Sequence, residues 1–250
     1  MPPAKDVVYY SRRKSTTPPH KAGWAVYMAA CFFGGSTTIL SSVTCRTIVY
    51  VDGFNLYYGA VRGSPHKWLD LQRYFRRLRN NDQIAQIYYF TALIAGATRP
   101  NQETYLRALD TLPVVTVVLG RFKDRWVQCN VRDCCYSGSR WFPKPEEKRT
   151  DVSIGIQMLD DAYRGRCDTM VLVSGDSDLV PAVSRVKTRF PDMSIVVYVP
   201  TRNPVRGAAV ELRSAADKHR DLPLQLLRHC QFPPTVADGA GGVIQKPADW

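Results

Sequence analysis

The sequence lacks the residue arrangements on which several enzyme classes depend. Histidine is scarce, with four in 250 residues, and His20, His66, His219 and His229 all lie far along the chain from the acidic motifs described below. No Ser-His or Cys-His pair is therefore predicted for nucleophilic catalysis. No Gly-x-Gly-x-x-Gly segment follows any predicted strand, which excludes a standard Rossmann dinucleotide site.

The seven cysteines form no recognisable framework. Their number is odd and their spacing is scattered, which argues against a set of disulfides and favours a reducing compartment. We therefore expect a cytoplasmic protein. Cys129, Cys134 and Cys135 lie close together. A structural zinc site needs four ligands, however, and neither a second cysteine pair nor a histidine follows at a suitable spacing.

Acidic residues are too few to balance the basic ones. Lysine and arginine number 34 against 22 aspartate and glutamate residues, so the net charge is +12, and most of the excess lies after residue 45. A basic body favours a polyanionic partner such as nucleic acid. A basic protein without such a partner is the alternative.

Residues 1–45 differ from the rest of the chain. Met1–His20 is polar and proline-rich, whereas Ala22–Cys45 carries no charge and has an apolar centre at Trp24–Phe33. Three interpretations stay open: an extension without structure, including a start codon placed too far upstream; a membrane or export segment; and an ordered appendage. We expect the extension, and no stable membrane association of the domain that begins at Arg46.

Strands and helices alternate from Thr47 onward. Apolar runs predict strands at Thr47–Val51, Gln86–Thr91, Val114–Leu119, Met170–Val173 and Ile195–Val199. Helical patterns cover Trp68–Arg79, Asn101–Leu112, Asp151–Tyr163, Pro181–Lys187 and Ala208–Ala216, with Leu222–Cys230 as a further candidate. This alternation indicates one α/β domain over residues 46–230, with a mainly parallel sheet and helices on both faces. Residues 231–250 are predicted to form a loose tail.

Two of the predicted strands end in acidic residues. Met170–Val173 is followed by Ser-Gly-Asp-Ser-Asp178, and Thr47–Val51 is followed by Asp-Gly-Phe-Asn55, while Asp151 opens a helix. Asp-Ser-Asp alone is also ordinary turn and helix-capping chemistry. Because the carboxyl ends of parallel strands meet at one edge of a sheet, we expect one cleft to hold Asp52, Asp151, Asp176 and Asp178.

Four carboxylates in one cleft require cations. Two of them about 4 Å apart repel by roughly 4 kcal/mol at an effective dielectric constant near 20. Mg²⁺ and Mn²⁺ prefer oxygen ligands and activate water for attack on phosphorus. The four aspartates therefore predict a metal site that hydrolyses phosphodiesters. Asn55 is expected to orient water or phosphate there, with a helix N-cap as the alternative.

Residues 120–150 form a long segment in which basic and aromatic residues alternate. Such a segment suits phosphates and stacked single-stranded bases, while a small packed hairpin with exposed arginines is the alternative. Lys148 is expected to touch phosphate, with a solvated loop lysine as the alternative. Ser174 is expected to bond to Asp176 or to a ligand, with turn formation alone as the alternative. The residues predicted to contact substrate are Arg125, Trp126, Lys148, Arg149 and Ser174.

Three motifs together resemble the NYN domain family, a branch of the PIN-like nucleases. They are Val51-Asp-Gly-Phe-Asn-Leu56, Glu147-Lys-Arg-Thr-Asp-Val152 and Leu172-Val-Ser-Gly-Asp-Ser-Asp-Leu179, in the order that the family has them. The resemblance implies a PIN-like three-layer α/β/α sandwich, Mg²⁺ or Mn²⁺ at the four aspartates beside Asn55, and RNA as the substrate. A metal-dependent ribonuclease is the first hypothesis.

A second resemblance gives a different enzyme class. Val51-Asp-Gly-Phe-Asn-Leu-Tyr-Tyr-Gly59 followed by Lys67-Trp-Leu-Asp-Leu71 is similar to a bacterial subgroup, some members of which carry the name 6-hydroxy-3-succinoylpyridine hydroxylase. That name implies an NADH-dependent monooxygenase of nicotine degradation acting on a small pyridine. A non-catalytic RNA-binding module is the third hypothesis, and a homo-oligomer is compatible with all three.

Overall fold

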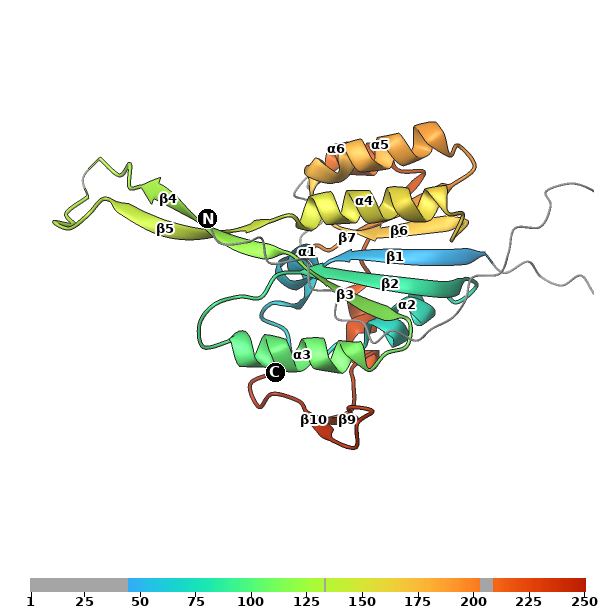
Figure 1. Ribbon diagram of the computed structural model, residues 1–250, viewed down its shortest axis with the longest axis horizontal. Helices are drawn as coiled ribbons and strands as arrows, with labels where there is room; N and C mark the ends of the chain where they lie inside the picture. The colour runs from blue at the N-terminus through green and yellow to red at the C-terminus, as the bar shows by residue number, and fades with distance from the viewer. Residues whose placement is uncertain (1–44, 133, 203–208) are drawn as a thin grey trace, which may run out of the picture.

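A six-stranded sheet lies between two layers of helices (Figure 1). The computed structural model describes residues 45–132, 134–202 and 209–250. All six strands are parallel, in the order β3-β2-β1-β6-β7-β8. They are β1 (Arg46–Asp52), β2 (Gln83–Thr91), β3 (Val115–Leu119), β6 (Thr169–Val173), β7 (Ser194–Val199) and β8 (Lys218–Asp221). The predicted three-layer α/β/α fold is confirmed, with a sheet that is parallel throughout.

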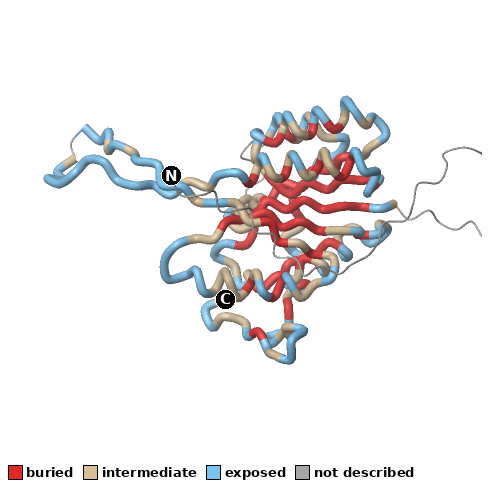
Figure 2. Tube along the Cα trace, viewed as in Figure 1, coloured by how far each residue is buried: buried red, intermediate tan, exposed pale blue. Residues whose placement is uncertain are grey.

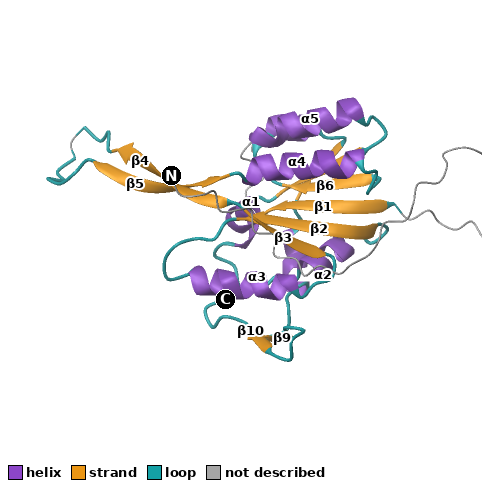
Figure 3. Ribbon diagram, in the orientation of Figure 1, coloured by secondary structure: helices purple, strands orange, loops and turns teal. Residues whose placement is uncertain are grey.

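The helices divide between the two faces of the sheet (Figure 3). One layer contains α1 (Gly53–Leu56), the π-helical turn η1 (Tyr57–Val61), α2 (Leu71–Leu78), α3 (Arg99–Asp110) and the 3₁₀ helix η3 (Leu224–His229). The other contains α4 (Thr150–Tyr163), α5 (Val180–Arg189) and α6 (Val210–Ala215), with the 3₁₀ turn η2 (Ser177–Leu179) leading into α5.

Each face of the sheet has its own apolar core. On β1, Val49 and Val51 pack into the core beneath α2 and α3, whereas Ile48 and Tyr50 pack into the core beneath α4 and α5. All four side chains are at most 2% exposed, and the central strands are buried along their length (Figure 2). Burial on both faces explains why these strands are continuous apolar runs without polar alternation.

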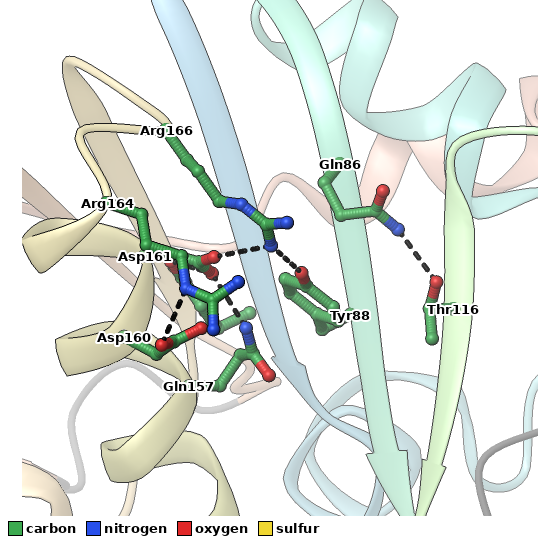
Figure 4. Close-up of polar contacts among 9 residues, drawn as sticks. Gln86, Tyr88, Thr116, Gln157, Asp160, Asp161, Arg164 and Arg166 are labelled. Atoms are coloured by element: carbon green, nitrogen blue, oxygen red, sulfur yellow. Dashed lines mark hydrogen bonds and ion pairs between the residues drawn. The ribbon is translucent and has the colours of Figure 1, made fainter. Parts of the chain in front are cut away.

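A buried carboxylate attaches α4 to the sheet. Asp161, near the end of α4, is fully buried and accepts hydrogen bonds from Tyr50 Oη at 2.9 Å, Gln157 Nε2 at 3.2 Å and Arg166 Nη1 at 3.1 Å. The same guanidinium donates to Tyr88 Oη on β2 at 3.4 Å (Figure 4). These bonds set the position of a helix whose opposite end carries Asp151.

Two predicted helix boundaries need correction. Helix α2 begins at Leu71 and not at Trp68, because the Asp70 carboxylate caps it by accepting from Arg73 N at 2.8 Å. Trp68 precedes the cap and is fully buried, with its indole Nε1 donating to Pro233 O at 2.8 Å. The Leu222–Cys230 candidate is a 3₁₀ helix over Leu224–His229.

The prediction of a loose tail over residues 231–250 is wrong. Strands β9 (Thr235–Ala237) and β10 (Val243–Gln245) form an antiparallel hairpin. Its glycines supply the turn, with positive φ at Gly239 and Gly241. Ile244 is 2% exposed, and the Trp250 ring centroid lies 6.4 Å from that of Trp68. The glycine-rich composition that suggested a loose tail instead forms the tight turn of this hairpin.

The segment 120–150 is a hairpin, as one of the two interpretations had it, but most of its length extends away from the body. Strands β4 (Arg121–Gln128) and β5 (Trp141–Lys148) pair antiparallel and project from the sheet (Figure 1). Almost all of their residues are exposed or half-buried.

The interpretations of residues 1–45 concern a segment that lies outside the described residues, except for Cys45. Among the residues that the structure does describe, no helix combines the length and the apolarity needed to cross a membrane.

Replacing Asp161 by alanine should lower the free energy of unfolding by about 2–3 kcal/mol, because the change leaves the Tyr50 hydroxyl buried without its acceptor. The matched control is Asp160→Ala. Asp160 is the next residue on α4, and its carboxylate pairs with Arg164 at 2.8 Å on the exposed side of the helix. Its loss should cost about 0.5 kcal/mol or less. Urea unfolding of both variants checks this, and equal losses would contradict the anchoring role.

Candidate metal centre

The strand order reverses direction between β1 and β6. From β1 the chain proceeds outward to β2 and β3, and then returns to β6 on the other side of β1. The chain leaves β1 toward α1 on one face and leaves β6 toward α5 on the other. Such a reversal opens a crevice at the carboxyl ends of the two strands, where open α/β sheets bind ligands. The pairing of Val51 with Val173 places Asp52 beside Ser174 in that crevice.

Asp52 is buried at the centre of the site and is held by three hydrogen bonds. It is 3% exposed and caps α1 by accepting from Asn55 N at 3.0 Å. The Asp52 carboxylate also accepts a hydrogen bond from Asn55 Nδ2 at 2.6 Å and another from Ser174 Oγ at 3.0 Å. Burial raises the pKa of Asp52, while these bonds act in the opposite direction and the nearby Asp176 adds to the rise.

Asn55 and Ser174 connect the ends of the two strands. Asn55 Oδ1 accepts from Gly175 N at 3.1 Å, so its amide bridges the loops after β1 and β6. The N-cap of α1 is Asp52, so the capping alternative for Asn55 is wrong. Ser174 is fully buried, and its hydroxyl donates to Asp52 and accepts from Asp176 N at 3.1 Å. The Ser174 hydroxyl thus orients Asp52 and bonds to the loop at Asp176, and its contact with substrate stays a prediction.

Three further carboxylates meet at the mouth of the crevice. Asp151, Asp176 and Asp178 each offer an oxygen within 4.8 Å of the others. Asp151 stands in the first turn of α4, where the helix dipole favours an anion. Asp176 caps η2 by accepting from Asp178 N at 3.0 Å. The structure thus brings together the predicted ligands, with Asp52 next to the group of three.

The three carboxylates repel one another, and no cationic side chain of the described residues forms an ion pair with them. Burial, followed by the charges of Asp176, Asp52 and Asp178, raises the pKa of Asp151 to about 6. Within the described residues, no lysine or arginine is in ion-pair contact with any of the three. A set of oxygen donors of one charge fits Mg²⁺ or Mn²⁺, which take carboxylate ligands.

Glu147 is a fifth acid that the sequence reasoning did not select. It lies at the base of β5, and burial together with the charges of Asp52 and Asp151 raises its pKa to about 7, although the Thr150 hydroxyl donates to it. Phe122, its partner across the hairpin, packs on Phe54 of α1 with ring centroids 5.5 Å apart. The sequence does contain a signal for this role, because Glu147 is the first residue of the motif Glu147–Val152. The basic residues around it in the loop made that signal weak.

The residues predicted to contact substrate fall into two groups. Lys148 and Arg149 lie directly before α4, close in sequence to Asp151, and Lys148 Nζ pairs with Glu146 at 3.0 Å. Arg149 is exposed and has φ of 84°, a left-handed conformation that costs a non-glycine residue about 1–2 kcal/mol. Arg125 and Trp126 lie farther out along β4, on the projecting hairpin (Figure 1).

Comparison with known proteins gives one family and one curated relative. The family model described as NYN domain matches residues 46–224. A curated protein, 6-hydroxy-3-succinoylpyridine 3-monooxygenase HspA of Pseudomonas putida (strain DSM 28022 / S16), is 31% identical over 245 residues, which cover 84% of this chain and 77% of that protein.

Two solved structures show a looser likeness. The protein of unknown function VPA0982 from Vibrio parahaemolyticus RIMD 2210633 has a TM-score of 0.49 and 21% identity, covering 73% of this chain and 96% of that one. The nicotinamidase SaPncA from Staphylococcus aureus has a TM-score of 0.31 and 14% identity, covering 71% of this chain and 99% of that one.

The raised pKa values of Asp151 and Glu147 predict how stability depends on pH without divalent cations. The folded state binds these protons more tightly than the unfolded chain does, so this stabilisation is present near pH 4 and is lost as the pH rises toward about 7. Solvent screening reduces the change in the free energy of unfolding to about 1 kcal/mol for each of the two carboxyl groups, which corresponds to about 2–4 °C in Tm.

Thermal unfolding in EDTA from about pH 5 to about pH 8 measures this dependence. The Asp151→Asn variant should lose less Tm over that range than the wild type, and Mg²⁺ should raise the wild-type Tm most at the alkaline end. Parallel pH profiles for the two proteins would contradict the assignment.

Proposed function

We propose, because the chain belongs to the NYN domain family, that it is a metal-dependent ribonuclease that hydrolyses phosphodiester bonds of RNA. One observation carries the proposal: Asp151, Asp176 and Asp178 converge at the switch point of the sheet beside the buried Asp52, and no lysine or arginine in the described part of the chain forms an ion pair with them. An uncompensated acidic cluster in a protein of net charge +12 suits a cation that in turn faces a phosphate.

The donor set defines what the site would hold. Asp151, Asp176 and Asp178 would be ligands of Mg²⁺ or Mn²⁺, with Asp52 as a fourth acid. The bound cation supplies Lewis-acid chemistry, which makes water a better nucleophile and stabilises negative charge on the phosphate. Asn55 and Ser174 keep the Asp52 carboxylate in one orientation through the bonds at 2.6 and 3.0 Å. Glu147, whose pKa is raised to about 7 by burial and the neighbouring acids, would exchange a proton with water or the leaving group.

The projecting hairpin provides a path for the RNA. Paired residues share a face, so one face carries Arg121, Lys123, Arg125, Lys144 and Lys148. The opposite face carries Phe122 with Glu147, then Trp126 opposite Pro143, and Trp141 near the tip. Trp126 and Trp141 are 63% and 53% exposed, as stacking platforms require. This aromatic face leads from the tip to the acidic crevice, so a single strand stacked on it reaches the carboxylates.

A cytoplasmic location belongs to the same proposal. The six cysteines among the described residues are all unpaired thiols, which agrees with a reducing compartment.

Replacing Asp176 by asparagine should reduce cleavage of single-stranded RNA in Mg²⁺ or Mn²⁺ by about 100-fold or more, because the stabilisation by a bound cation is worth several kcal/mol. The Tm of the metal-free variant should equal or exceed that of the wild type, since a repelling charge is removed. Gel assays of end-labelled RNA measure the cleavage.

The matched control is Asp192→Asn. Asp192 is exposed in the loop between α5 and β7, which enters β7 at its amino end, opposite to the acidic crevice. This variant should cleave like the wild type. Equal activity of the Asp176→Asn variant would show that the cleavage does not arise at this site.

A second candidate function is favoured by the curated relative. HspA is named a 6-hydroxy-3-succinoylpyridine 3-monooxygenase and is 31% identical, so an NADH-dependent hydroxylase acting on that small pyridine is the alternative. It assigns no task to the acidic cluster, and this is why the nuclease is preferred. The third candidate, an RNA-binding module, keeps the hairpin surface without turnover.

One preparation tested in both assays separates these candidates. Intact RNA in either metal, combined with NADH oxidation that depends on the pyridine, would favour the hydroxylase. RNA retention that salt weakens, without product in any metal, would favour the binding module.

A further inference from the structure

A cavity with aromatic walls lies beside the acidic crevice. It has a volume of about 330 Å³ and is enclosed by α1 and η1, the end of β2, α3 and the final residues of the chain. Gly53 lines it, and the preceding residue is Asp52, so the cavity begins one residue from the buried acid of the site. Asp151, Asp176 and Asp178 do not line it.

The walls are flat rings. They include Tyr57, Tyr58, Tyr89, Tyr105 and Trp250. The centroids of Tyr105 and Trp250 lie 5.7 Å apart, and those of Tyr89 and Tyr105 lie 6.1 Å apart at nearly a right angle. A cavity of this size that combines aromatic walls with polar side chains is typical of a site for a small planar molecule.

Most polar groups in the walls already have partners. Gln102 accepts from Ile94 N and donates to Ala92 O, both at 2.9 Å. Tyr105 Oη donates to Leu69 O at 2.9 Å, and Asn101 Nδ2 donates to Asp249 at 3.1 Å. These side chains shape the cavity, but their existing hydrogen bonds limit the bonds that they can form with a ligand.

Tyr89 differs from these groups. It is 7% exposed, and within the described part of the chain its hydroxyl forms no hydrogen bond. Burial raises the pKa of Tyr89, so the group stays protonated and can donate a hydrogen bond to a molecule in the cavity. Its ring is fixed by the close approach of Gly53, where a Cβ would lie 2.8 Å from it.

Cations stand among the residues that line the cavity. The Arg62 guanidinium lies 5.3 Å from the Tyr58 ring centroid, and Lys67 Nζ lies 5.9 Å from that of Trp250. Rings for stacking next to cations for phosphates match the two parts of a nucleotide.

We infer that this cavity receives one unstacked base of the RNA strand, adjacent to the phosphate that is cleaved. The inference rests on the proposed nuclease function and adds a base-binding subsite to it. The base stacks among Tyr57, Tyr105 and Trp250, the Tyr89 hydroxyl donates to an acceptor on its edge, and Arg62 or Lys67 pairs with the adjoining phosphate. Because Gly53 lines the cavity and directly follows Asp52, the base and the cleaved phosphate would belong to neighbouring nucleotides.

Oligonucleotides with a single abasic site, moved one position at a time, test the inference. Cleavage in Mg²⁺ or Mn²⁺ should fall about 10- to 100-fold when the missing base lies at one fixed position relative to the cleaved bond. Tyr89→Phe should raise KM and weaken the preference among the four bases at that position. Ile94→Trp, which fills the cavity from its half-buried wall, should reproduce the abasic effect on intact RNA. Tyr163→Phe, on the exposed side of α4, is the matched control and should change nothing.

The outcomes separate this inference from the proposed function. Normal cleavage that no abasic position slows would overturn the subsite and leave the nuclease standing. If no RNA is cleaved, the nuclease fails, and fluorescence anisotropy of labelled RNA with the Asp176→Asn protein decides on the subsite. A position-specific abasic defect in binding supports it, and equal binding overturns it. Binding of free nucleosides or other free heteroaromatic rings, without any abasic effect on RNA, would assign the cavity to a small molecule and also overturn it.

Discussion

Repulsion among carboxylates held at one edge of the sheet is the constraint on which the site depends. The parallel pairing of β1 with β6 leaves Asp52 and Asp176 no freedom to separate, and α4 brings Asp151 to the same place. Hydrogen bonds reduce the free-energy cost of this repulsion. Asp52 and Asp176 cap short helices, and the Asn55 and Ser174 side chains donate hydrogen bonds to Asp52. Burial, and after it the charges of the neighbouring aspartates, still raise the pKa of Asp151, so the arrangement suits a divalent cation.

The rest of the fold holds this arrangement in place. At one end of α4, Asp161 is bonded to Tyr50 on β1, and the guanidinium that pairs with it also reaches β2, so the helix cannot shift Asp151 away from the crevice. At the start of α1, a Cβ on Gly53 would lie 2.7 Å from Phe90 O. A glycine after Asp52 therefore lets the chain turn closely over β2. The site is built from the ends of rigid elements, which limits the movement of its carboxylates.

Much of this could be predicted from the sequence because the deciding features are local. Buried parallel strands are apolar runs, and the rule that ligands bind at their carboxyl ends predicts that Asp52 and Asp176 lie together. The features that were missed depend on distant contacts. The polar edge strand β8 has no apolar run, the tail is ordered by Trp250 packing near Trp68, and Glu147 is a site residue only because the hairpin base folds against α1. The bridging role of Asn55 likewise needs Gly175, 120 residues away.

The central claim is that these carboxylates form a binding site for divalent cations, and diffraction from crystals grown with Mn²⁺ tests it most directly. Anomalous data collected at the manganese edge should show a peak in contact with Asp151, Asp176 and Asp178, and the peak should weaken or vanish in the Asp176→Asn protein. A map with no peak among the three residues, in crystals with millimolar Mn²⁺, would contradict the account. So would a peak that Asp176→Asn leaves unchanged.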